Sequence, residues 1–183
     1  TVVDPESFEV LDEIAVGDNP DGIAAVGGRV FVANSAFGAG NTVSVIDAAT
    51  ADARPVEVDC DGPRWAEADA DGDVFIFCTG QVIYDDSWNA IGSTDGAVIV
   101  LSGTSGEVVG RIDVDGRIGA SEFGQDAYFD AVSERIFVLR SADDHFMVDV
   151  IDTRSNTISS SIGPFEGQIG AVAFDSSADE LYL

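Results

Sequence analysis

Lysine is absent from this chain of 183 residues, and its eight basic residues, all arginine, stand against 34 aspartates and glutamates. The formal net charge of −26 would repel the phosphates of nucleic acids and the head groups of anionic lipids, so neither is expected as a partner. No apolar run approaches the roughly 18 residues of a membrane-spanning helix. We therefore expect no membrane insertion in this segment.

Histidine occurs once, as His145, which excludes metal sites built from several histidines. A Ser-His-Asp triad would have to use this residue, and no G-x-S-x-G sequence is present to supply the nucleophile. Beside Asp143 and Asp144, His145 is expected on a solvated loop. The glycine-rich segments 38–40 and 103–110 lack the lysine or the third glycine of phosphate-binding loops. The sequence predicts no catalytic residue.

Apolar residues are nevertheless plentiful: 45% of the chain is hydrophobic and the mean hydropathy is +0.16, which is too apolar for disorder. The chain should therefore fold around a substantial core. It has no initiator methionine and no leader before Thr1, and Leu183 falls within a predicted strand. We expect the sequence to be a piece of a longer protein.

The last segment, 148–183, divides into four short runs rich in Val, Ile, Phe and Tyr, separated by turn-forming residues. Such runs are typical of strands in a tight antiparallel meander. The same pattern starts at Asp4, Asp47, Ser102 and Asp152, which are 43, 55 and 50 residues apart, and this period indicates a β-propeller or another repeat array. The predicted repeats of this single domain, or propeller fragment, are approximately 1–40, 41–94, 95–144 and 145–183.

Two other architectures fit less well. Helical repeats need apolar positions three and four residues apart over ten or more residues, and these runs are shorter. A β-sandwich would not repeat one four-part pattern four times. In a propeller, each blade is buried on both faces, which explains why segments 73–78 and 97–101 are apolar almost throughout.

The repeat, V-x-V-I-D-x-x-T followed by a G-x-x-P-x-G-(I/V)-A segment and an aromatic strand ending in V-A-N, resembles the YVTN-type β-propeller repeat of surface-layer and related extracytoplasmic proteins. The second and third copies depart from it, with Arg64 and Trp65 after Pro63 and no proline in the third. The matching residues are Val45, Ile46, Asp47 and Thr50; Ile14, Val16, Gly17, Pro20, Gly22, Ile23 and Ala24; Phe31, Val32, Ala33 and Asn34; and Val150, Ile151, Asp152, Thr153, Asn156, Thr157, Ile158, Ile162 and Tyr182.

This resemblance implies an all-β propeller of four-stranded antiparallel blades and an extracytoplasmic location: secreted, periplasmic or at the cell surface. Its phasing makes 21–26 an innermost strand, followed outward by 29–34 and 43–47. The chain would then contain two outer strands of one blade, three complete blades and two inner strands of another. We expect about four blades' worth of strands, as an arc of a larger ring in preference to a closed four-bladed ring.

The same phasing gathers the long loops on one end of the propeller, where binding usually occurs. The insertion from Gln81 to Thr94 is the strongest candidate. We predict that its Tyr84, Asp85, Asp86 and Trp88, together with Arg64, Trp65 and Arg117 of the crossing loops, bind a ligand. The alternative is that this insertion is a lid whose aromatic side chains cover a sheet edge. The partner would be a protein or a carbohydrate at the cell surface.

The alternating acids Asp69, Asp71 and Asp73 could converge on calcium, but Val74 stands where a calcium loop needs glycine, and Asp71-Gly72 is typical of a hairpin turn. No cofactor is therefore predicted, with calcium as the open alternative.

Cys60 and Cys78 flank one predicted hairpin. They could form a disulfide if the protein is exported, or remain two buried thiols.

Two functions follow from these observations. The favoured one is a non-enzymatic propeller that binds a partner through its long-loop face. We expect it to come from a halophilic organism, because dense carboxylates keep a protein hydrated in high salt. The alternative is a propeller hydrolase or lactonase with its site at the central channel, which Arg64, Arg117 and Glu122 could reach.

Overall fold

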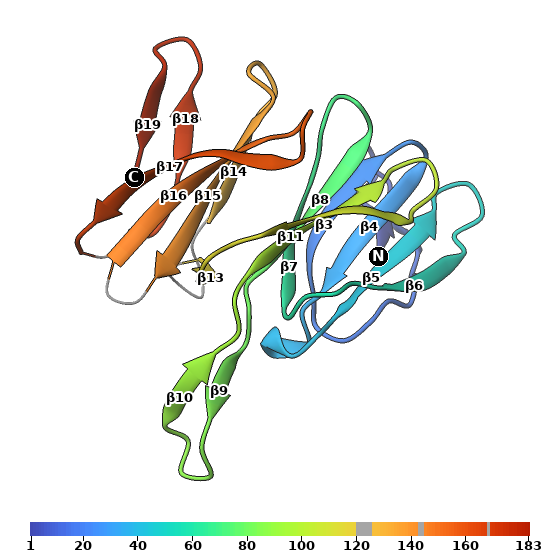
Figure 1. The fold of residues 1–183 in the computed structure, drawn as a ribbon. Helices are drawn as coiled ribbons and strands as arrows, with labels where there is room; N and C mark the ends of the chain where they lie inside the picture. The colour runs from blue at the N-terminus through green and yellow to red at the C-terminus, as the bar shows by residue number, and fades with distance from the viewer. Residues whose placement is uncertain (120–125, 143–144, 168) are drawn as a thin grey trace.

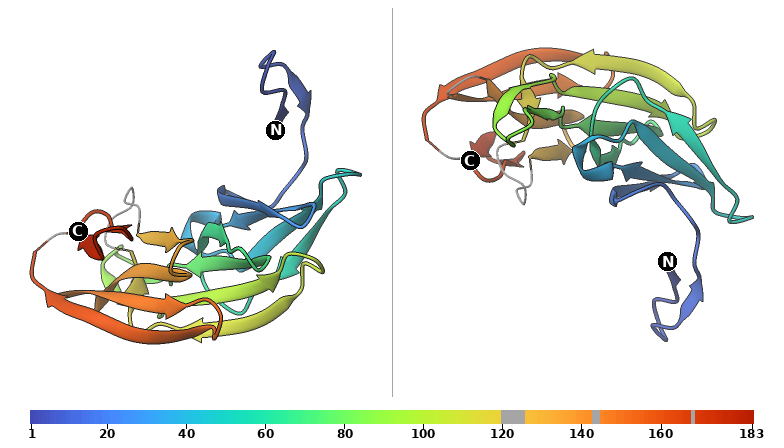
Figure 2. Two further views of the ribbon diagram at one scale, coloured as in Figure 1. Left: turned by 90° about the horizontal axis from the view of Figure 1, so that it is seen from above. Right: turned by 90° about the horizontal axis from the view of Figure 1, so that it is seen from below.

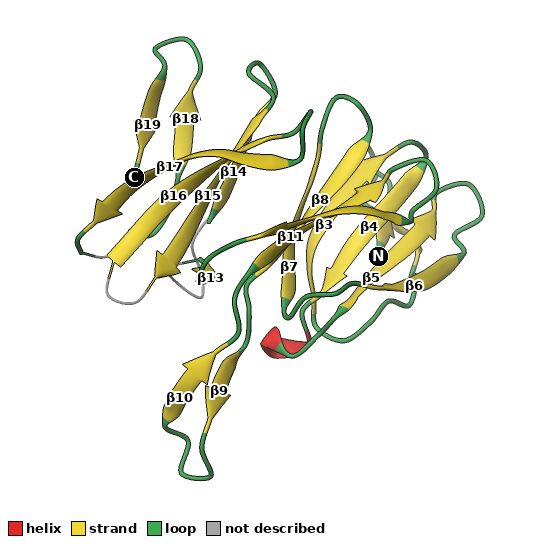
Figure 3. Cartoon of the chain, viewed as in Figure 1, coloured by secondary structure: helices red, strands yellow, loops and turns green. Residues whose placement is uncertain are grey.

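The computed structural model describes residues 1–119, 126–142, 145–167 and 169–183. Strands and their connecting loops account for this part of the chain, apart from one short 3-10 turn, η1 (Ala36–Gly38) (Figure 3). The all-β class predicted from the short apolar runs is therefore confirmed. The described residues contain no helix of the length and apolarity needed to cross a membrane.

Two complete four-stranded antiparallel blades come first, and in each the spatial order of strands follows the order in the chain. The first blade contains β3 (Pro20–Val26), β4 (Arg29–Asn34), β5 (Thr42–Asp47) and β6 (Ala53–Glu57). The second contains β7 (Pro63–Ala68), β8 (Asp73–Cys78), β11 (Ala97–Ser102) and β12 (Val108–Asp113). Between β8 and β11, the hairpin of β9 (Val82–Tyr84) and β10 (Ala90–Ser93) projects from the body (Figure 1).

The third blade has an innermost edge made of two pieces. Both β13 and β14 pair with β15, β13 at Arg140 and Ser141 and β14 nearer the start of β15. The segment after β12 was predicted to be a loop, but pairing with β15 makes part of it a strand. The elements are β13 (Arg117–Ile118), β14 (Ala127–Asp130), β15 (Arg135–Ala142), β16 (His145–Asp152) and β17 (Thr157–Phe165).

Each end of the chain forms a two-stranded sheet of its own: β1 (Val2–Val3) with β2 (Val10–Asp12), and β18 (Ala173–Asp175) with β19 (Glu180–Tyr182). The first of these hairpins projects away from the blades in both views of Figure 2. Within the described residues the two hairpins do not pair with each other. The strands form a partial propeller of three blades, with a two-stranded hairpin at each end of the chain. The prediction that the first hairpin is the outer half of another blade stays a prediction.

The core lies between blades and not within them. Along β8, Val74 and Ile76 point into a cluster shared with the first blade, and the alternate residues Phe75 and Phe77 point into a cluster shared with the third. All four side chains are fully buried, each contributing on the order of 1.5–3 kcal/mol to folding. A blade covered on both faces therefore has strands that are apolar at every position.

The inner strands of neighbouring blades approach so closely that one position requires glycine. A Cβ on Gly22 of β3 would lie 2.6 Å from the carbonyl oxygen of Arg64 and from the Cα of Trp65 in β7. This contact brings the start of β7 and its arginine next to the start of β3. The arginine consequently faces the end of the first blade where the long loops lie.

Candidate functional site

A cleft of about 570 Å³ opens on the long-loop face and is lined by residues of all three blades. Its walls come from the residues that lead into β3, the η1 turn after β4, the start of β7, the segment from β8 into β9, and β13. These segments are connected by antiparallel strands, so they emerge at the same end of the blades. Three of the seven residues predicted to bind a ligand line this cleft: Arg64, Tyr84 and Arg117.

The Arg64 side chain is 26% exposed, and its Nε lies 3.8 Å from Oδ2 of Asp21, which also lines the cleft. Its guanidinium carbon lies 4.7 Å from the centre of the Trp65 ring, within the range of a cation–π contact. Trp65 itself packs against the cluster between the second and third blades. The predicted ligand residue Trp65 therefore supports Arg64 from the core side and does not line the cleft.

Arg117, at the start of β13, differs from the other arginines. Its Nε is buried and has no hydrogen-bond partner. The side chain of each of the other seven arginines makes a hydrogen bond or an ion pair with a described residue, and the Arg117 side chain makes none there. A buried donor without a partner destabilises the fold by about 1–3 kcal/mol. The Nη groups of Arg117 are the part of this guanidinium that can meet a ligand in the cleft.

The hairpin 81–94 is held by its own turn. Oδ1 of Asp85 accepts the backbone N–H groups of Ser87 at 2.8 Å and Asn89 at 2.9 Å, and the Asn89 side chain donates to Oδ2 at 3.1 Å. These hydrogen bonds, the Asn89 side chain first, lower the pKa of Asp85 from its ordinary value. Asp85 is therefore engaged in the turn, whereas the neighbouring Asp86 is exposed.

Two aromatic residues of this hairpin lie together, with Tyr84 and Trp88 ring centres 6.1 Å apart at an interplanar angle of 49°. Tyr84 is 51% exposed and Trp88 is 83% exposed. Of the two, Tyr84 reaches the cleft, and Trp88 lies at the tip of the hairpin. If the hairpin were a lid over a sheet edge, the aromatic rings that cover the edge would be buried. The exposure of Tyr84 and Trp88 does not fit that alternative.

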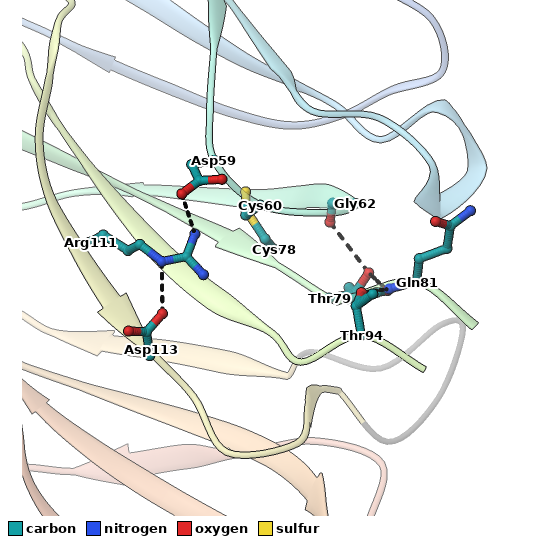
Figure 4. The surroundings of a disulfide bond; sticks show 10 residues. Asp59, Cys60, Gly62, Cys78, Thr79, Gln81, Thr94, Arg111 and Asp113 are labelled. Atoms are coloured by element: carbon teal, nitrogen blue, oxygen red, sulfur yellow. Dashed lines mark hydrogen bonds and ion pairs between the residues drawn. A yellow bond between two sulfur atoms is a disulfide. The ribbon is translucent and has the colours of Figure 1, made fainter. Parts of the chain in front are cut away.

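A disulfide joins Cys60 to Cys78, with Cα atoms 6.0 Å apart (Figure 4). Cys78 is buried in the core and directly precedes the cleft wall. In that wall the Thr79 hydroxyl donates to the Gly62 carbonyl at 3.3 Å, and the backbone N–H of Gln81 donates to Oγ1 of Thr94 at 2.8 Å. The disulfide thus ties the base of the hairpin to the chain that enters β7.

The three acids considered for calcium lie in and beside the β7–β8 turn. Oδ1 of Asp69 accepts the backbone N–H groups of Gly72 and Asp73, both at 2.8 Å. In the ranges that the structure describes, no three metal-ligating side chains gather at one point. Asp69 is therefore committed to the hairpin turn.

Three other acids considered from the sequence, Glu122, Asp143 and Asp144, lie outside the described residues. His145 was predicted on a solvated loop, and this is wrong. It is half-buried as the first residue of β16, because the β15–β16 hairpin extends beyond its apolar centre and pairs Ala142 with His145.

Sequence reasoning missed several cleft residues, among them Asn19, Ser35 and Phe37. Asn19 donates from Nδ2 to Oγ of Ser35 at 2.7 Å, which joins the entry of β3 to the end of β4. Phe37 lies in η1 and is 90% exposed. The sequence shows a phenylalanine in a long loop, which could have suggested a binding residue. That it lines the same cleft as Tyr84 depends on how the blades pack.

No protein-family model matches the chain, and no curated protein is found as a relative. Solved structures do resemble it. The hydrazine synthase of Kuenenia stuttgartiensis aligns over 87% of this chain and 41% of its own, with a TM-score of 0.64 and 20% identity. The dihydro-heme d1 dehydrogenase NirN in complex with DHE aligns over 88% of this chain and 32% of its own, with a TM-score of 0.56 and 15% identity. The chain therefore spans less than half of either protein, and at these identities the likeness establishes a β-propeller fold.

Proposed function

We propose that this chain is part of a non-enzymatic β-propeller of the YVTN type that is secreted, periplasmic or displayed at the surface of a halophilic organism. It binds a ligand through its long-loop face. The observation that carries the proposal is the cleft on this face, in which Arg64, Arg117 and Tyr84 meet from separate loops. Concave sites of several hundred cubic ångströms with a few convergent polar groups are typical of ligand binding.

The position of the perturbed carboxyl groups favours binding over acid–base catalysis at this cleft. Burial raises the pKa of Glu67, and burial followed by the charges of Asp69 and Asp71 raises the pKa of Asp73. Both residues lie near the β7–β8 turn, at the opposite end of these strands from Arg64. Among the described residues, these two carboxyl groups with a raised pKa are thus remote from the cleft.

Two properties support an exported protein in a saline environment. The Cys60–Cys78 disulfide is typical of oxidising compartments outside the cytosol. The net charge of −26, with no lysine, is suited to high salt, where counterions screen the repulsion among carboxylates.

Replacement of Tyr84 by alanine tests the binding site. Immobilised wild-type protein is exposed to a panel of neutral and acidic oligosaccharides and peptides, and retained compounds are identified by mass spectrometry. The Tyr84→Ala variant should lose the compounds that the wild type retains. Tyr182→Ala is the matched control, since Tyr182 is similarly exposed at 54% and lies on β19, outside the cleft. Equal retention by wild type and Tyr84→Ala would exclude the cleft as the binding site.

A second function, a propeller hydrolase or lactonase, is favoured by one observation: Arg64 and Arg117 line the same cleft and could stabilise an oxyanion there. Turnover of ester or lactone substrates that is lost in Arg117→Gln would support it. Absence of turnover by folded wild-type protein over a broad panel would exclude it.

A further inference from the structure

We infer that the ligand of this cleft is an acidic oligosaccharide whose carboxylate binds Arg117, a sugar of the uronic-acid class. The inference rests on the proposed binding function and adds the chemical class of the ligand. It follows from three features of the cleft: its charge, the unpaired guanidinium, and the groups that surround it.

The described residues that line the cleft carry a net positive charge, although the chain as a whole is strongly negative. Two arginines, Arg64 and Arg117, line it against one carboxylate, Asp21, in a chain with a net charge of −26. Acids elsewhere repel an anion at long range, but high salt screens interactions beyond a few ångströms. The local balance of charges in the cleft then decides what binds, and it favours an anion.

The Arg117 side chain is not paired with a carboxylate of the described residues. In this acid-rich chain other arginines pair with carboxylates of the chain itself: Arg54 with Glu107 at 2.9 Å, Arg111 with Asp113 at 2.7 Å and Arg140 with Asp149 at 2.7 Å. The Arg117 side chain lines the cleft and has no such partner within the described ranges, and its Nε is buried there without a hydrogen bond. A planar guanidinium binds a carboxylate through two parallel hydrogen bonds, and the two Nη groups of Arg117 are the donors left for a ligand carboxylate.

The rest of the cleft suits a sugar body. Tyr84 and Phe37 present flat apolar area, on which the C–H faces of sugar rings pack. The side-chain amide of Gln81 and Oδ1 of Asn19 make no hydrogen bond to a described residue, so they can meet hydroxyl groups. Figure 4 shows the Gln81 side chain extending away from Thr94. A peptide carboxylate is usually captured by successive backbone N–H groups instead, which favours the sugar.

The test compares two ligands that differ only in charge: trigalacturonic acid and its fully methyl-esterified form. Calorimetric titration of the purified protein, at a constant salt concentration that keeps it folded, should show binding of the acid and at least about tenfold weaker binding of the ester. Thermal midpoints recorded in the same buffer verify that each variant is folded.

Three substitutions give effects of known sign. Arg117→Gln should weaken binding of the acid at least about tenfold and leave the ester unchanged, while Arg117→Lys should recover part of the loss. Asp21→Asn removes a carboxylate from the cleft and should strengthen acid binding about two- to fivefold. Arg54→Gln is the control, because Arg54 is paired with Glu107 outside the cleft and its loss should leave acid binding unchanged.

Equal affinity for the acid and the ester would overturn the inference, as would unchanged acid binding by folded Arg117→Gln. Binding of neither trisaccharide by folded wild-type protein would also overturn it. The proposed binding function depends on a separate result, the loss of retained compounds in Tyr84→Ala, so the two can fail independently.

Discussion

Aspartates at strand ends hold the turns of this propeller. Oδ1 of Asp47 accepts the backbone N–H groups of Ala49 and Thr50, and Oδ1 of Asp4 does the same for Glu6 and Ser7. In the third repeat Ser102 replaces the aspartate, and its hydroxyl accepts from Ser105 at 3.3 Å. The aspartate of the V-I-D pattern thus has a local structural role: it satisfies backbone donors where the chain turns back toward the outer strand.

Asp152 should make the free energy of unfolding depend on pH in the acidic range. The backbone N–H of Ser155, followed by its hydroxyl, lowers the pKa of Asp152 below the ordinary value of 3.8. A carboxyl group with a lowered folded-state pKa stabilises the protein above pH 3.8, and this contribution is lost as the pH falls through the folded-state value. Urea unfolding should show wild type more stable than Asp152→Asn at neutral pH, with the difference shrinking below pH 3.8.

Asp86→Asn is the control for this measurement, since Asp86 is exposed and makes no hydrogen bond within the described part of the chain. A difference between wild type and Asp152→Asn that stays constant with pH would contradict the prediction.

Glu67 should show the opposite pH dependence. Burial raises its pKa above the ordinary value of 4.5, so the ionised form disfavours folding. Its contribution to stability is present below pH 4.5 and is lost as the pH rises through the folded-state pKa. Glu67→Gln should therefore raise the thermal midpoint at neutral pH, and the gain should vanish below pH 4.5. A lower midpoint for the variant at neutral pH would show that the carboxylate is stabilising.

Among the elements, the disulfide fixes the base of the projecting hairpin. It closes a loop across a sequence separation of 18 residues, for which loop entropy predicts about 3 kcal/mol of stabilisation. The double variant Cys60→Ala, Cys78→Ala should lower the thermal midpoint by roughly 10 °C. Differential scanning calorimetry of the wild type and the double variant, at one salt concentration, measures the change in midpoint. An unchanged midpoint would mean that the packing of β7 on β8 holds this region without the disulfide.

At the same scale, the β9–β10 hairpin was expected as an insertion and its fold could not be foreseen in detail. Apolar and polar residues do not alternate regularly along its sequence. The hairpin is held by the hydrogen bonds of the Asp85 turn and by the hydrogen bond from the Gln81 backbone N–H to Oγ1 of Thr94. The predicted aromatic residues Tyr84 and Trp88 do lie on it. Whether either reaches a binding surface depends on the direction in which the hairpin leaves the blade, and this direction is set by residues beyond the hairpin.

For the whole molecule, the net charge of −26 should make folding depend on salt. Repulsion among carboxylates is screened as the Debye length shortens from about 10 Å at 0.1 M to about 3 Å at 1 M. The thermal midpoint should rise steeply over this interval of sodium chloride concentration. Titration with millimolar calcium at low sodium chloride is the comparison, because rescue by calcium alone would indicate a specific metal site instead of general screening. A midpoint independent of salt would contradict halophily.

The sequence by itself determined most of the strands, their phasing into three blades and the burial of both faces of the central blade. These properties are local or periodic: short apolar runs, turn-forming residues and a pattern that recurs four times suffice to specify them. Arg64, Tyr84 and Arg117 could be named from the sequence because they lie in loops that the phasing sends to one end.

The composition of the cleft was decided only by the tertiary structure. Arg64 and Asn19 are far apart in the chain, and they line one cleft because the inner strands of the first two blades approach closely at Gly22. The packing of the third blade on the second turns Trp65 into the core and brings Arg117 to the cleft, where it has no partner within the described residues. Contacts of this kind depend on distances between blades, and no local pattern encodes those distances.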